Sequence, residues 1–332
     1  LAVWAGIFIC FLLLSLLLKQ RAGEGKLREV LMILSAALIV IQASGYVSAR
    51  VSLTEEVLNK DLYLSTDGEF ELSSQKNVLY FILDTCDREY VEASLEADPE
   101  LFAEYTGFTS YRNATSKYSR TYPALPFLLT GEKCYFDMPD SEYIRQAYEN
   151  GTFLPDLDDA GTDIRLYTSL NYIDRDSYNR VDNVSAYDSS ALGNLSVGSL
   201  IKAMIRLGGY QEMPYLLKPI FYYTPDPINR NVLKALPENY FTMTNNDFEF
   251  YERLQQKQVT VNESYSSAFR LYHLFGPHPG CYMNEKAEYD PNASQTDAAR
   301  GDFLILSQYI RYLKEKGLYD NTAIIITADH GN

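Results

Sequence analysis

The sequence has little histidine, cysteine and basic charge for its length. Its 332 residues include three histidines and four cysteines, and 29 lysines and arginines stand against 44 aspartates and glutamates, for a formal net charge of −15. An acidic chain of this kind binds nucleic acid poorly, because the phosphate backbone is also negative. The spacing of the cysteines does not match a thiolate metal site; they are Cys10, Cys86, Cys134 and Cys281. The composition therefore argues against a nucleic-acid-binding protein and against a cysteine-ligated metal domain.

Internal repeats and low-complexity tracts are also absent from the sequence. With 46% hydrophobic and 22% charged residues, the chain can bury a full core. We expect one large domain, over 76–332, with an N-terminal appendage over 1–50 and a polar linker over 51–75.

Two long apolar runs make up most of the appendage, from Val3 to Leu18 and from Val30 to Val47. Each is close to the length that a bilayer core requires, so we predict two transmembrane helices. The loop from Lys19 to Arg28 carries four basic residues and one acid, which places it in the cytoplasm. The alternative is a cleaved signal peptide, but the sequence has no small-residue cleavage site after the first run. The sequence therefore predicts a multi-pass protein of the cell membrane whose large domain is extracytoplasmic.

Strand and helix patterns alternate along the large domain, which predicts an α/β fold with a mostly parallel sheet. The run from Ala323 to Thr327 is typical of a fully buried parallel strand. Further strands are expected over 78–83, 164–169 and 268–274, and helices over 88–95, 121–131, 141–149, 153–160 and 297–316. Residues 171–261 carry scattered prolines and tyrosines and are predicted to form an irregular insertion. Because the last strand would need a further helix and strands to complete the sheet, we also expect the chain to continue past Asn332.

Acidic and histidine side chains follow several of these strands. Asp84 follows the first strand, and Asp329 and His330 follow the last. Ligands of open α/β sheets gather at the carboxyl ends of the strands, so these residues could hold one cation. Either aspartate alone could equally cap a following helix or turn. The other two histidines, His273 and His278, also lie at a strand end and in the turn after it, and we therefore expect all three histidines to share a site.

Four blocks in this order resemble the alkaline phosphatase and sulfatase superfamily. They are Asn77–Asp84, Thr121–Gly131, His273–His278 and Ala328–Asn332. The similarity is to the membrane-anchored phosphotransferase branch, which includes lipoteichoic acid synthases and lipid A phosphoethanolamine transferases. It implies an alkaline-phosphatase-like catalytic domain, with a parallel sheet flanked by helices, over 76–332.

The resemblance also implies the chemistry of the site. Thr121 would be the nucleophile, and one divalent metal, Zn²⁺ or Mn²⁺, would be held by Asp84, Thr121, Asp329 and His330. His273 and His278 would stabilise or protonate the leaving group. The implied reaction moves a phospho-alcohol group, of the phosphoglycerol or phosphoethanolamine type, from a lipid-linked donor to a cell-surface glycan or lipid through a phosphothreonine intermediate.

Two departures from the sulfatase pattern narrow this interpretation. Sulfatases convert a Cys or Ser to formylglycine, whereas this block has Thr121, which cannot form that aldehyde. Sulfatases also often have paired aspartates at the first strand, but Thr85 and Cys86 separate Asp84 from Asp87. This favours a single-metal transferase and makes Asp87 either a ligand or a helix cap. A sulfatase-like phosphodiesterase or sulfuric ester hydrolase, and a degenerate binding or sensor domain, remain alternatives.

Overall fold

The computed structural model describes residues 2–52, 62–186, 197–222, 239–241 and 247–331. The chain divides into two compact units, one formed by Leu1–Asp61 with Ala186–Leu236 and the other by Leu62–Ser185 with Pro237–Asn332. The expected linker over 51–75 and insertion over 171–261 do not coincide with these boundaries. Residues 62–72 pack into the second unit, and so do the helix and strand at the end of the expected insertion.

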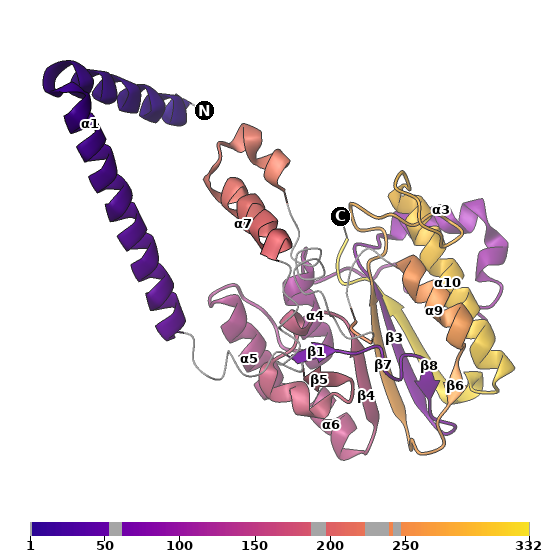
Figure 1. Cartoon of the computed structure of the whole chain (residues 1–332). Helices are drawn as coiled ribbons and strands as arrows, with labels where there is room; N and C mark the ends of the chain where they lie inside the picture. Colours follow the sequence, from indigo (N-terminus) through magenta and orange to yellow (C-terminus); the bar gives the residue numbers. More distant parts are fainter. Residues whose placement is uncertain (1, 53–61, 187–196, 223–238, 242–246, 332) are drawn as a thin grey trace. The chain divides into compact units, whose positions relative to one another are not determined.

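A four-stranded parallel sheet forms the centre of the second unit (Figure 1). Its strands lie in the order β4-β7-β3-β8, and their bounds are Asp163–Tyr167, Ala268–Leu274, Asn77–Leu83 and Thr322–Thr327. Each strand is a run rich in β-branched, aromatic or leucine side chains, which suit a pleated sheet packed on both faces. The predicted parallel α/β sheet is therefore confirmed.

Helices cover both faces of the sheet (Figure 1). On one face lie α3 (Arg88–Ala97), α9 (Asp247–Lys257) and α10 (Gln295–Glu315). On the other lie α4 (Thr121–Thr130), α5 (Asp140–Asn150) and α6 (Phe153–Asp159). All of these except α9 were predicted from the sequence. Short elements complete the unit: η1 (Pro99–Phe102), η2 (Leu170–Tyr172), η3 (Arg175–Arg180), η6 (Tyr319–Asn321), and the strand pairs β1 (Leu62–Leu64) with β5 (Val184–Ala186) and β2 (Glu71–Leu72) with β6 (Thr260–Val261).

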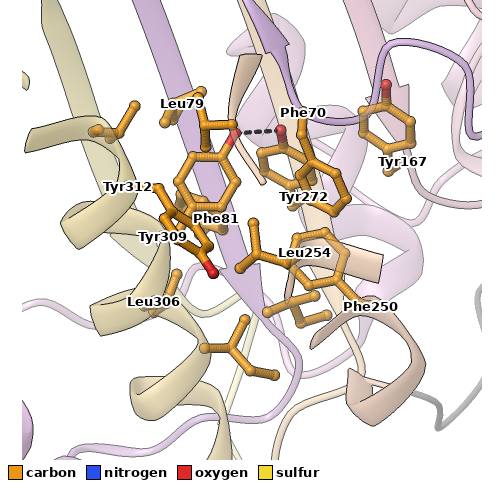
Figure 2. Close-up of a cluster of buried hydrophobic side chains, with 14 of the residues drawn as sticks. Phe70, Leu79, Phe81, Tyr167, Phe250, Leu254, Tyr272, Leu306, Tyr309 and Tyr312 are labelled. Carbon is orange, nitrogen blue, oxygen red and sulfur yellow. Dashed lines mark hydrogen bonds between the residues drawn. The ribbon is translucent and has the colours of Figure 1, made fainter. Parts of the chain in front are cut away.

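Aromatic side chains dominate the core between the sheet and helices α9 and α10 (Figure 2). Phe81 of β3 stacks on Tyr272 of β7 with ring centroids 4.8 Å apart. The Tyr272 and Tyr309 hydroxyls are hydrogen-bonded at 2.8 Å, so these polar atoms are paired although both residues are fully buried. Burial of several large side chains here supplies much of the hydrophobic stabilisation that holds β3 and β7 in place.

The last strand, β8, is less buried than its sequence predicted. Its residues alternate between half-buried and exposed, and Ile325 is 46% exposed. The reason is its position, because β8 is the edge strand of the described sheet and pairs only with β3. The prediction of a fully buried strand was therefore wrong for this part of the chain.

The first unit contains the helix α1 (Ala2–Ser52), which is interrupted at Gly23, where φ is 81°. Within it, Gly25–Gly45 is long and apolar enough to cross a membrane and is the one such helix in the described residues. A membrane span or signal near the N-terminus is thus supported where the run from Val30 to Val47 lies, whereas the span predicted from Val3 to Leu18 stays a prediction. The unit also contains α7 (Val197–Glu212) and η5 (Tyr215–Phe221).

Candidate active site

Strand register places the predicted site residues at one edge of the sheet. Ile82 of β3 pairs with His273 of β7 and with Thr327 of β8. Asp84 lies two residues after Ile82, and Asp329 lies two residues after Thr327. The parallel strands therefore deliver three side chains to a common point although they are far apart in the sequence.

The resulting cluster is compact and buried. Asp84, His273 and Asp329 each offer one ligand atom, and these atoms lie within 4.8 Å of one another. His330 is adjacent, with Nε2 at 3.6 Å from Asp84 Oδ1 and 3.5 Å from Asp329 Oδ2. The family resemblance implied that His273 stabilises or protonates the leaving group. In the structure, however, its Nε2 lies 3.8 Å from Asp84 Oδ2, inside the cluster.

Thr121 brings a hydroxyl to the same cluster from the first turn of α4. Its Oγ1 lies 3.4 Å from His330 Nε2, and Thr121 is near enough to the Asp84 carboxyl to lower its pKa, against the effect of burial. The N-cap of α4 is Arg120, and Thr121 is the first helical residue. Thr121 therefore lies inside α4 and is not its N-cap. The helix ends at Gly131, whose φ of 77° is the left-handed conformation that glycine adopts at little cost.

Backbone groups fix the orientation of Asp329. Its Oδ1 accepts hydrogen bonds from the amides of Thr85, at 3.2 Å, and His330, at 2.7 Å. Thr85 has a φ of 56°, which is rare for a β-branched residue and costs on the order of 1–3 kcal/mol. Strain at the turn after β3 is thus tolerated where it presents an amide to the site.

Burial sets the ionisation of the cluster. It raises the pKa of Asp84 to about 8, and the negative charges of Asp329 and Asp247 add to this effect. Burial also lowers the pKa of His273 to about 4, with the nearby Asp329 acting in the opposite direction. Without a cation, the site therefore favours a neutral Asp84 and a neutral His273 at physiological pH.

The donor atoms fit a divalent metal. Asp84 Oδ1, His273 Nε2 and Asp329 Oδ2 are buried and have no hydrogen-bond partner among the described residues. Such atoms are costly unless something pairs with them. His273 Nδ1 contacts Thr168 Oγ1 at 3.0 Å, and His330 Nδ1 contacts the Gly331 carbonyl at 2.7 Å. These contacts orient both rings and leave each Nε2 facing the cluster, the usual arrangement of histidine ligands.

The remaining predicted residue, His278, lies at the rim. Its Nδ1 is 2.9 Å from the Pro279 carbonyl, and its ring packs on Phe275 with centroids 4.7 Å apart. It is close enough to influence the buried cluster, since its charge lowers the pKa of His273 further. Asp87, considered as a ligand or a cap, occupies the N-cap position of α3 without a side-chain cap bond, and its carboxylate lies against Gly331.

Three residues that support the site were missed by the sequence analysis: Thr85, Thr168 and Asp247. Asp247 is the first residue of α9, and its carboxylate accepts hydrogen bonds from the amides of Phe275 and Gly276, at 3.0 and 2.8 Å. It therefore fixes the turn between His273 and His278. The spacing of Phe250, Tyr251 and Leu254 after an acidic start would have indicated this helix.

No protein-family model and no curated protein matches the chain. Among solved structures, it is similar to a protein of the alkaline phosphatase superfamily from Vibrio parahaemolyticus, with a TM-score of 0.39 and 12% identity over 82% of this chain and 57% of that one. It is also similar to a proposed sulfatase, yidJ from Bacteroides fragilis, with a TM-score of 0.38 and 15% identity over 77% of this chain and 62% of that one. The chain thus spans about three fifths of the length of either protein. Likeness of this degree carries no argument about a reaction or a substrate.

Proposed function

We propose that this protein is a metal-dependent enzyme that transfers a phospho-alcohol group to an acceptor alcohol through a phosphothreonine on Thr121. The observation that carries the proposal is the position of the Thr121 hydroxyl. It lies 3.4 Å from His330 Nε2, beside a buried set of carboxylates and imidazole that fits one divalent cation. Helix capping does not explain why a hydroxyl stands at this position, because the N-cap of α4 is Arg120.

The proposed roles fall on the metal ligands, the nucleophile and the proton donor. Asp84, His273, Asp329 and His330 would hold Zn²⁺ or Mn²⁺, which supplies Lewis acidity and charge neutralisation for a phosphoryl group. His330, whose Nε2 lies 3.4 Å from Thr121 Oγ1, orients this oxygen for attack. Thr121 gives up its hydroxyl proton to solvent as the bond from its Oγ1 to phosphorus forms, and the bond from phosphorus to the leaving alkoxide breaks.

Proton transfer completes the first half of the reaction. The leaving alcohol needs a proton, and the proposed donor is His278, whose charge is felt by His273 of the cluster. In the second half, an acceptor alcohol attacks the phosphothreonine and regenerates the Thr121 hydroxyl. Water in place of the alcohol would give hydrolysis instead, which is the alternative reaction of the same site.

The proposed donor is a lipid-linked phosphate ester of the phosphoglycerol or phosphoethanolamine type, and the proposed acceptor is a cell-surface glycan or lipid. Support comes from the Gly25–Gly45 helix, which is suited to a membrane. The basic loop from Lys19 to Arg28 supports an extracytoplasmic orientation of the second unit. Formylglycine-dependent sulfate hydrolysis is disfavoured because position 121 is threonine.

The test is a trapping experiment with product analysis. The full chain, loaded with Zn²⁺ or Mn²⁺, is incubated with phosphatidylglycerol or phosphatidylethanolamine, and the peptide containing Thr121 is analysed by mass spectrometry. A phospho-alcohol adduct on Thr121, and a new phosphodiester when glycerol or a glycan is added, are the expected results. If only the hydrolysis product forms, the protein is a phosphodiesterase and the proposed transferase activity is wrong.

A non-catalytic binding or sensor domain gives a different result in the same preparation. Such a domain would form no adduct on Thr121, and a protein that retains neither Zn²⁺ nor Mn²⁺ after dialysis would contradict the metal-dependent mechanism. Metal content is therefore measured by elemental analysis on the same sample.

A further inference from the structure

The helical hairpin formed by α7 and η5, residues 197–222, has an unusually apolar surface. Outside α1, the described chain has only nine other exposed large hydrophobic side chains, scattered over 62–331. The hairpin alone exposes eleven: Ile201, Met204, Ile205, Leu207, Tyr210, Met213, Tyr215, Leu216, Leu217, Ile220 and Tyr222. A concentration of this kind marks an interaction surface on a folded protein.

The hairpin has internal packing contacts, so the exposure of these side chains is not the result of a missing local structure. Phe221 of η5 lies against Gly209 of α7, where a Cβ would collide with its ring. The Met213 amide donates to the Gly209 carbonyl at 3.0 Å, and Lys218 Nζ lies 5.4 Å from the centre of the Tyr210 ring. The apolar side chains therefore face outward from a defined structure.

The pattern along α7 is amphipathic. Ile201, Met204 and Ile205 recur at the spacing of one helix face. Lys202 and Arg206 are four residues apart and share a neighbouring flank. With Lys218 they give the hairpin three cations against the single acid Glu212, a sign opposite to that of the chain as a whole.

We propose that the α7–η5 hairpin lies in the surface of an anionic lipid bilayer, with its apolar side chains at the boundary of the acyl chains and its cations at the lipid phosphates. The net positive charge of the hairpin favours an anionic bilayer as its partner, because cations beside an apolar face complement anionic headgroups. Lys202 and Arg206 in the middle of α7 argue against a transmembrane orientation. The inference goes beyond the proposed function and holds whether or not Thr121 carries a phosphoryl group.

Tryptophan fluorescence tests the inference in the full chain. The sequence has one tryptophan, Trp4, so a Trp4→Phe background allows one new probe to be read alone. Tyr215→Trp places the probe on the hairpin, where the tyrosine is 89% exposed. Tyr111→Trp is the matched control in the second unit, where the tyrosine is 79% exposed. Each protein is reconstituted in phosphatidylglycerol and phosphatidylcholine vesicles with brominated or ordinary acyl chains.

Brominated lipid should quench the Tyr215→Trp protein at least about twofold more than the Tyr111→Trp protein, because the hairpin probe contacts acyl chains. Adding Lys202→Gln, Arg206→Gln and Lys218→Gln should reduce this quenching to the level seen in vesicles of phosphatidylcholine alone. Equal quenching of the two probes would overturn the membrane contact. Quenching that is unchanged by the three substitutions would overturn the role of the anionic lipid. Circular dichroism verifies that the variants fold.

Discussion

The backbone amide of Thr85 donates a hydrogen bond to Asp329 Oδ1 across 3.2 Å and so joins the ends of β3 and β8. The same oxygen accepts from the His330 amide at 2.7 Å. One carboxylate oxygen is thus occupied by the backbone, while Oδ2 is buried, has no hydrogen-bond partner within the described part of the chain, and faces the cluster. Asp329 therefore has separable structural and ligand roles.

Asp329→Asn tests this separation. Asparagine can keep Oδ1 for the two backbone amides while it replaces the charged ligand oxygen by an amide nitrogen. We expect the affinity for Zn²⁺ or Mn²⁺ to fall by more than about tenfold with little change in fold. Isothermal titration calorimetry measures the affinity, and Asp320→Asn, at an exposed position of η6, is the control. An unchanged affinity would remove Asp329 from the ligand set.

Thr168, which directly follows β4, supports His273, and removal of its hydroxyl should weaken metal binding indirectly. Thr168→Val keeps the shape of the side chain but deletes the hydroxyl 3.0 Å from His273 Nδ1. We expect a loss of about 10- to 100-fold in metal affinity, the usual effect of losing such a partner. Thr162→Val is the matched control, since the Thr162 hydroxyl pairs with Ser267 Oγ, at 2.8 Å, away from the cluster. Equal effects of the two substitutions would indicate a general loss of stability instead.

Thr121→Ala should abolish turnover, whereas Thr121→Ser should retain part of it because serine keeps a hydroxyl at the first turn of α4. Rates are measured on the proposed phospholipid donors, and thermal unfolding shows whether the fold survives. The control is Thr130→Ala at the other end of the same helix, where the hydroxyl donates only to the Pro126 carbonyl and accepts from the Glu132 amide. Turnover by the Thr121→Ala protein would eliminate the covalent route.

The raised pKa of Asp84 predicts a pH dependence of stability in the metal-free protein. From pH 6.5, the ordinary pKa of histidine, to about 8, Asp84 is mostly protonated in the folded state and ionised in the unfolded state, whereas His273 is neutral in the folded state and at most half protonated in the unfolded state. The folded state binds more protons, so the free energy of unfolding falls as pH rises, by up to about 1.4 kcal/mol per pH unit.

Chemical denaturation of the metal-free protein at several pH values checks this prediction, with Asp84→Asn as the comparison. The difference between the two proteins isolates Asp84 from other titrating groups such as Asp302, whose pKa is also raised by burial. The slope of the wild-type protein should be the steeper one. Parallel curves would show that Asp84 does not titrate in this range.

The ends of the strands could be predicted from the sequence because a β-branched run followed by Asp or His is a local pattern. Asp84, Asp329 and His330 were found in this way, and the structure brings them together. The contact of Thr168 with His273 could not be found, because it depends on β4 lying beside β7, and strand order is not encoded in any short segment. The same limit explains Ile325, whose exposure depends on which strand covers β8.

Helix α9 was missed for a different reason. Its apolar spacing is clear, but the prolines and tyrosines that precede it suggested an irregular segment throughout. As a result Asp247, which fixes the turn after His273, was overlooked. The apolar spacing of Phe250 and Leu254 indicates this helix better than the composition of the residues around it does.

Gly331, which follows His330, lies against the carboxylate of Asp87 with no room for a Cβ. A methyl group there would force the Asp87 carboxylate, which makes no side-chain cap bond to α3, into another rotamer. A library randomised at codons 87 and 331 together, followed by selection for a functional protein, should consequently return paired changes, with side chains at 331 accompanied by a shorter residue at 87.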